Sequence, residues 1–213
     1  MKSAFFVTAV LACLMPLTVH SAVVKTETIR ITPPPQETPQ IDPEDTLKYP
    51  EEPAATSGDA PTVYYDVNLL PEPVRATRNA LVSALREGSI EKIGAIIEAQ
   101  KFPPHLLFGE MEDPVTYLKQ SSGDGEGLEI MAIMADILDA GFVRWNAGTE
   151  NETYIWPYFA HYPMNELTNK QKTEMFRIVT AADYFEMKDY GTWTFYRLGI
   201  AADGQLMYFV AGD

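Results

Sequence analysis

The sequence predicts an α+β fold, in which N-terminal helices are followed by a small antiparallel sheet that ends in a C-terminal hairpin. Residues 192–200 and 205–210 are two runs rich in aromatic and β-branched side chains, and Asp203-Gly204 between them is a strong hairpin-turn signal. Apolar side chains lie on both faces of the first run, which favours a strand covered on both sides. Helical periodicity dominates earlier, from residue 71 to residue 140. Segregation of helices and antiparallel strands along the chain is typical of α+β proteins.

The first half of the folded region is predicted to be helical. Residues 71–87 carry apolar side chains at helical spacing and end at Gly88. Ser89 is a good N-cap for a second helix that ends near residues 102–104, so the two helices form an αα-hairpin. A short helix is expected over residues 115–120, because an aspartate N-cap at position 113 is followed by proline.

The second half begins with a central helix over residues 128–140, whose wide apolar stripe indicates burial. Strands are expected over residues 142–145 and 154–159, and a proline in the second places it at an edge or a bulge. Residues 168–171 form a capping box for a late helix that carries Met175, Phe176, Ile178 and Val179 inward, and residues 181–190 form a further helix.

The first 21 residues are predicted to be a signal peptide. Lys2 supplies the positive start, and the apolar core over residues 4–17 is too short to span a bilayer as a stable helix. Cys13 lies in this core, and its lipidation is disfavoured because Leu11 is large for a lipobox. We therefore expect a periplasmic or secreted protein with no transmembrane helix after signal removal.

Residues 22–61 are predicted to be a disordered linker, because proline and acidic side chains crowd into them and little apolar surface is available for burial. Residues 62–213 are then expected to form a single α+β domain, and about 150 residues is a common domain size.

The net charge of −14 disfavours nucleic acid and anionic membrane surfaces as partners. After signal removal only His105 and His161 remain, with no metal-ligand spacing, so no metal or cofactor is expected. No serine-nucleophile motif is present, and the glycine-rich residues 121–127 lack the lysine of a phosphate loop. No catalytic residue is assigned.

Aromatic side chains are concentrated in the last third of the chain, and the run from Trp156 to Tyr162 is the candidate binding segment. We take Trp156, Tyr158, His161 and Tyr162 as its site residues. Prolines at 157 and 163 hold the backbone off regular structure, so this segment is expected to be partly exposed, whereas Trp193 is expected to be buried. The alternative is that all of these rings pack in the core.

Several short stretches resemble a family of exported proteins from Gram-negative bacteria. They are residues 123–127, 154–160, 167–168, 196–200 and 210–213, and the resemblance covers about residues 62–213. It implies an envelope location and brings no catalytic residues. The order of helices first and sheet last is similar to the NTF2-like α+β cone, at the level of fold alone.

Two functions follow as hypotheses. The first is a non-catalytic module that binds a protein or an envelope component through the Trp156–Tyr162 segment. The alternative is an enzyme with a small NTF2-like pocket that uses His161 or a buried carboxylate as general base. A deep polar pocket favours the enzyme, and a filled core favours the module.

Overall fold

The computed structural model describes residues 60–106 and 113–212. The chain divides into two units, Met1–Glu51 and Glu52–Asp213, and all described residues belong to the second. The expected signal peptide, Cys13 and all of the linker except residues 60 and 61 lie outside the described residues. Within the described ranges, no helix has the length and apolar character needed to cross a membrane.

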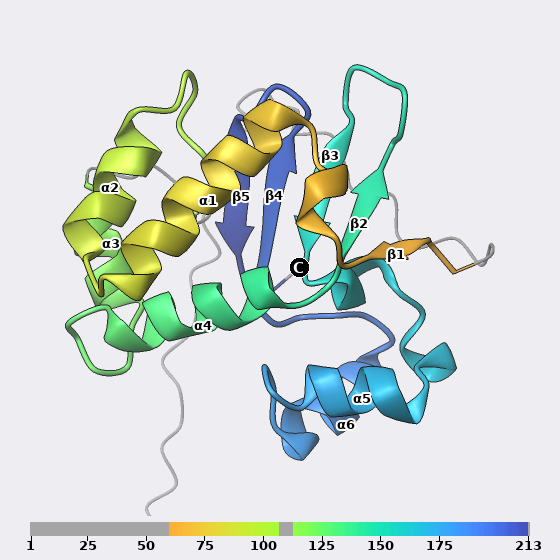
Figure 1. Ribbon diagram of the computed structural model, residues 1–213. Helices are drawn as coiled ribbons and strands as arrows, with labels where there is room; N and C mark the ends of the chain where they lie inside the picture. The colour runs from red at the N-terminus through yellow and green to blue at the C-terminus, as the bar shows by residue number, and fades with distance from the viewer. Residues whose placement is uncertain (1–59, 107–112, 213) are drawn as a thin grey trace, which may run out of the picture. The chain divides into compact units, whose positions relative to one another are not determined.

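Helices and strands follow one another largely as the sequence predicts (Figure 1). In chain order the elements are β1 (Val63–Tyr64), η1 (Val67–Leu69), α1 (Glu72–Arg86), α2 (Ile90–Glu98), α3 (Pro114–Gln120), α4 (Leu128–Asp139), β2 (Phe142–Trp145), β3 (Thr153–Trp156), η2 (Tyr158–His161), η3 (Met164–Glu166), α5 (Asn169–Met175), α6 (Ala181–Tyr190), β4 (Arg197–Ala201) and β5 (Leu206–Val210), where η denotes a 3-10 helix. The predicted α+β class and the C-terminal hairpin are confirmed. Strand β1 and the three 3-10 helices are additions that the sequence analysis did not predict.

The five strands form one sheet in the order β1-β2-β3-β4-β5, and each neighbouring pair is antiparallel. His105 forms a parallel β-bridge with the outer edge of β5. Its N–H donates to the Met207 carbonyl at 2.8 Å, and its carbonyl accepts from the Phe209 N–H at 3.0 Å. On the opposite edge, β1 pairs only with Phe142 and Val143 of β2.

One face of the sheet packs against α1–α4. Side chains alternate along β2, β3 and β4, and the register shift between β4 and β5 brings both Leu206 and Phe209 of β5 to this face. The buried cluster there combines sheet residues Phe142, Tyr154, Trp156, Leu198, Ile200, Leu206 and Phe209 with helix residues such as Val74, Leu81, Ile93 and Ile137. The wide apolar stripe of α4 is buried in this cluster, as predicted.

The other face is covered by η2, η3, α5 and α6, which lie apart from α1–α4 in Figure 1. Val143 and Ile155 come from the sheet, and Met175, Tyr184 and Trp193 come from the segment that covers it. Both faces of the sheet are therefore buried, as the apolar pattern of the C-terminal hairpin predicts.

The strand expected over residues 154–159 is shorter than predicted, and it is the central strand of the sheet rather than an edge or bulged strand. It ends at Trp156, because Pro157 has no N–H to donate to a strand ladder. Tyr158 begins η2 instead, and its N–H donates to the Gly141 carbonyl at 2.9 Å.

The hairpin strand expected from residue 192 begins only at Arg197. The indole N–H of Trp193 donates to the Tyr196 carbonyl at 3.1 Å, so Trp193 is held by a local contact rather than by a strand ladder. Trp193 is buried, at 3% exposed, as expected.

The late helix begins at its predicted capping box but is shorter than its apolar pattern suggests. Thr168 caps α5, which ends at Met175. Met175 and Val179 are buried, as predicted. Phe176 is 44% exposed, so the prediction that it faces inward is wrong.

Candidate functional site

The four predicted site residues are divided between the two faces of the sheet. Trp156 shares the α1–α4 face with Tyr154, and its ring lies 5.1 Å from that of Phe142. It is 0% exposed, so the expectation that this part of the segment is partly exposed is wrong. Strand alternation is the physical reason, because β3 continues through Trp156 and directs it into the larger core.

Tyr158, His161 and Tyr162 lie on the opposite face of the sheet, at or beside η2. Tyr158 is also fully buried, and His161 is 7% exposed with its ring 4.4 Å from that of Trp145. Tyr162 is half-buried and lies edge-on to Tyr158, with 5.6 Å between ring centroids. Of the four residues, only Tyr162 is not buried.

A residue outside the predicted segment completes this group. Tyr65 follows β1, is 54% exposed, and lies edge-on to Tyr158 with 6.2 Å between ring centroids. Its hydroxyl donates to the Glu174 Oε2 of α5 at 2.9 Å, and the Tyr158 hydroxyl donates to the same oxygen at 3.3 Å. We call Tyr65, Tyr158, Tyr162 and Glu174 the tyrosine–glutamate patch.

The backbone fixes the carboxylate at the centre of this patch. The Gly141 N–H donates to Glu174 Oε1 at 3.1 Å. Gly141 leaves room for the patch, since a Cβ there would lie 2.9 Å from carbon atoms of Val63 and Tyr65 and 3.0 Å from a carbon atom of Tyr158. Substitution of Gly141 would therefore force these side chains apart.

Both hydroxyls that donate to Glu174 are held in the protonated form. Burial is the main cause that raises the pKa of Tyr158 far above its usual value, and the neighbouring Tyr65 and Glu174 raise it further. Partial burial also raises the pKa of Tyr65, with Glu174 adding to the effect through its hydrogen bond and its charge. The two hydroxyls that contact Glu174 are therefore neutral at neutral pH.

Sequence reasoning missed Tyr65 and Glu174. The run Val63-Tyr64-Tyr65 is rich in strand-forming side chains directly after the proline-rich linker, so it carried a usable signal for a first strand. Glu174 gave no such signal, because its role depends on the packing of α5 beside Gly141.

The buried carboxylate that the enzyme hypothesis requires exists, but it is fully bonded. Glu152 is 8% exposed, and Arg144 donates to its two oxygens at 2.8 and 2.7 Å. The Tyr154 hydroxyl and the Gly148 N–H donate to it at 2.7 and 2.6 Å. These donors lower the pKa of Glu152 to about 2, and the hydrogen bonds from Arg144 make the largest contribution.

Two surface hollows lie elsewhere. One of about 450 Å³ lies between α1 and α2, lined by small side chains such as Ala80, Ala84 and Ala95. A second, of about 300 Å³, lies beside Lys119 and Glu126. None of the four predicted site residues lines either hollow. In the ranges that the structure covers, no group of three or more metal-binding side chains is found.

The glycine-rich segment over residues 121–127 caps α4. The Asp124 carboxylate accepts hydrogen bonds from the N–H groups of Glu126, Gly127 and Leu128, at 3.0–3.2 Å. This segment therefore leads into the central helix, and its acidic side chains complement the positive end of the helix dipole.

Comparison of the chain with protein-family models, with curated proteins and with solved structures finds no match. The tyrosine–glutamate patch is therefore defined by the contacts and burial of its own residues.

Proposed function

We propose that the protein is an exported cell-envelope protein that acts as a non-catalytic binding module, and that it contacts a protein or an envelope component through the tyrosine–glutamate patch. The accessible rings of Tyr65 and Tyr162 form the contact surface. The fully buried Tyr158 and the Glu174 carboxylate support them from below.

The observation that carries this proposal is the state of Tyr65. Its ring is 54% exposed, yet its hydroxyl is held 2.9 Å from Glu174, which is itself held by a backbone N–H. A tyrosine that is ordered before binding loses little side-chain entropy when a partner covers it. Tyrosine is also among the residues that contribute most to binding energy in interfaces.

The alternative function, an enzyme that uses His161 or a buried carboxylate as base, stays a prediction, as does the NTF2-like pocket on which it depends. A general base needs a free lone pair and a pKa near the working pH. Glu152 meets neither condition, because four donor groups surround it and its pKa is about 2. His161 packs against Trp145 and lines neither hollow.

Co-sedimentation with isolated envelope fractions tests the proposal. The mature chain is mixed with peptidoglycan sacculi, inner-membrane vesicles or outer-membrane vesicles from a Gram-negative bacterium. We expect one fraction to retain it, and the double variant Tyr65→Ala/Tyr162→Ala to lose that retention.

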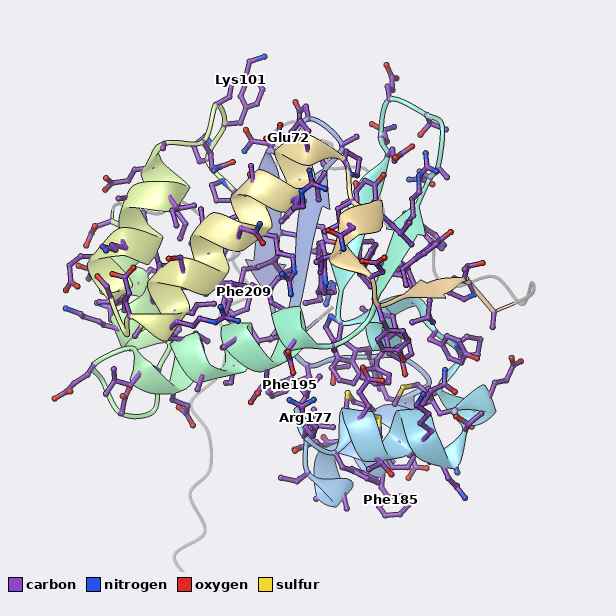
Figure 2. All side chains as sticks on the ribbon, viewed as in Figure 1. Glu72, Lys101, Arg177, Phe185, Phe195 and Phe209 are labelled. Carbon is purple, nitrogen blue, oxygen red and sulfur yellow. The ribbon has the colours of Figure 1, made fainter. Side chains whose placement is uncertain are left out.

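The matched control is Phe185→Ala. Phe185 is 59% exposed, similar to Tyr65, but it belongs to α6, which contributes no residue to the patch (Figure 2). The proposal fails if no fraction retains the wild-type chain, or if the control loses retention as fully as the patch variant does.

A further inference from the structure

We infer that the tyrosine–glutamate patch binds a cationic side chain, so that its partner is a protein that presents an arginine or lysine in a basic, exposed segment. This inference rests on the proposed function and specifies the chemistry of the partner.

The first argument is the bonding of Glu174. Within the described residues, every hydrogen bond that this carboxylate accepts comes from a neutral donor: the hydroxyls of Tyr65 and Tyr158 and the N–H of Gly141. These donors orient the carboxylate and none of them is a cation, although the Arg177 guanidinium lies near enough to interact with Glu174 through its charge. A guanidinium or ammonium group that approaches it gains a charge-assisted contact.

Three of the cations on neighbouring elements are engaged with other groups. Arg177, three residues after Glu174, pairs with Asp139 at 2.7 Å, and Arg144 of β2 pairs with Glu152 at 2.7 Å. Lys172 of α5 lies 6.0 Å from the centre of the Tyr184 ring. The cation that complements Glu174 can therefore come from a partner.

The second argument is the arrangement of the rings. Tyr65 and Tyr162 each stand edge-on to Tyr158, at interplanar angles of 70° and 85°. The faces of aromatic rings attract cations, and cages built from aromatic rings bind ammonium ligands. Rings and carboxylate thus favour the same kind of ligand.

The charge of the whole protein supports the same partner. The chain carries 30 acidic and 16 basic side chains, and its long-range field therefore attracts a basic protein. Asp66 directly follows Tyr65 and is exposed, which places a further negative charge beside the patch.

Titration with two defined peptides tests this inference. One probe is acetyl-Gly-Arg-Gly-Arg-Gly-amide, and its neutral counterpart carries glutamine in place of arginine. The reporter is the amide resonance of Gly141 in the mature chain, because this N–H donates directly to Glu174. We expect the arginine peptide to shift this resonance in a saturable manner and the glutamine peptide to leave it unchanged.

Three variants distinguish peptide binding at the patch from non-specific attraction by the net negative charge of the protein. We expect Tyr65→Leu, which keeps the net charge, to weaken binding of the arginine peptide about two- to fivefold, the range of an exposed cation–π contact. Glu174→Gln should weaken binding as well, whereas Glu186→Gln, which removes one exposed charge on α6, should not.

The inference is overturned if both peptides shift Gly141 equally, or if Tyr65→Leu binds as well as the wild-type chain. It is also overturned if Glu186→Gln weakens binding as much as Glu174→Gln, since attraction would then be non-specific. Tyr65→Leu changes an exposed side chain, so it remains informative if Glu174→Gln fails to fold. If patch variants lose envelope retention while the arginine peptide does not bind, the proposed function stands and only the cationic partner is excluded.

Discussion

Replacement of Glu152 by glutamine is expected to remove a pH-dependent contribution to stability. The pKa of Glu152 falls from 4.5 to about 2 on folding, chiefly through its paired hydrogen bonds with Arg144. One pKa unit is worth about 1.4 kcal/mol, so the ionised carboxylate stabilises the fold by about 3 kcal/mol at most. Because the Arg144 side chain is 43% exposed, solvent screening reduces this to about 2 kcal/mol.

The sign follows from the lowered pKa. The folded state resists protonation of Glu152, so the stabilisation is complete above pH 4.5 and is lost as the pH falls towards 2. We expect Glu152→Gln to be about 2 kcal/mol less stable than the wild-type chain at pH 7, and this difference to shrink between pH 4.5 and pH 2.

Urea unfolding, followed by tryptophan fluorescence at several pH values, measures the free energy of unfolding. Glu150→Gln is the matched control, because Glu150 lies in the same β2–β3 connection and is exposed. It should change stability little. A difference between Glu152→Gln and wild type that is constant from pH 7 to pH 3 would refute the reasoning.

Three further predictions concern the core, a turn and export. Trp156→Ala and Trp193→Ala should each lower the free energy of unfolding by about 3–5 kcal/mol in urea titrations, because both rings are buried; a much smaller loss for Trp156→Ala would contradict its position in the core. Gly204→Ala should cost more stability than Gly148→Ala in thermal unfolding. Both glycines have left-handed φ angles, but only at Gly204 would a Cβ lie 2.8 Å from the Pro73 carbonyl oxygen. Equal losses would show that this close contact does not affect stability. Residues 1–30 fused to a reporter that is active only outside the cytoplasm should give signal, and a cytoplasmic product that retains them would show that they do not direct export.

Much of the fold could be predicted because its signals are local. Ser89 and Thr168 cap helices where their spacing indicates, and Gly204 lies in the turn of the C-terminal hairpin. Such signals depend on the backbone hydrogen bonds of a few consecutive residues. They place an element to within a few residues without any knowledge of its neighbours.

The candidate site was harder to predict because it depends on contacts between distant segments. Tyr65 and Glu174 are 109 residues apart, and nothing in either local sequence indicates that they meet. The error at Trp156 has a related cause: Pro157 suggested irregular backbone, but β3 continues as far as Trp156 and turns its ring towards the helices. Partner strands and helices decide which rings are covered, and one local pattern does not reveal them.

Site-specific photocrosslinking in living cells tests most directly whether the tyrosine–glutamate patch is a binding surface. A benzoyl-phenylalanine is placed at Tyr65 in one variant and at Phe185 in the other, two positions that are 54% and 59% exposed. Irradiation should give a discrete crosslinked product from position 65 and none of the same mass from position 185. The absence of a product from position 65, or the same product from both positions, would contradict the assignment of the patch.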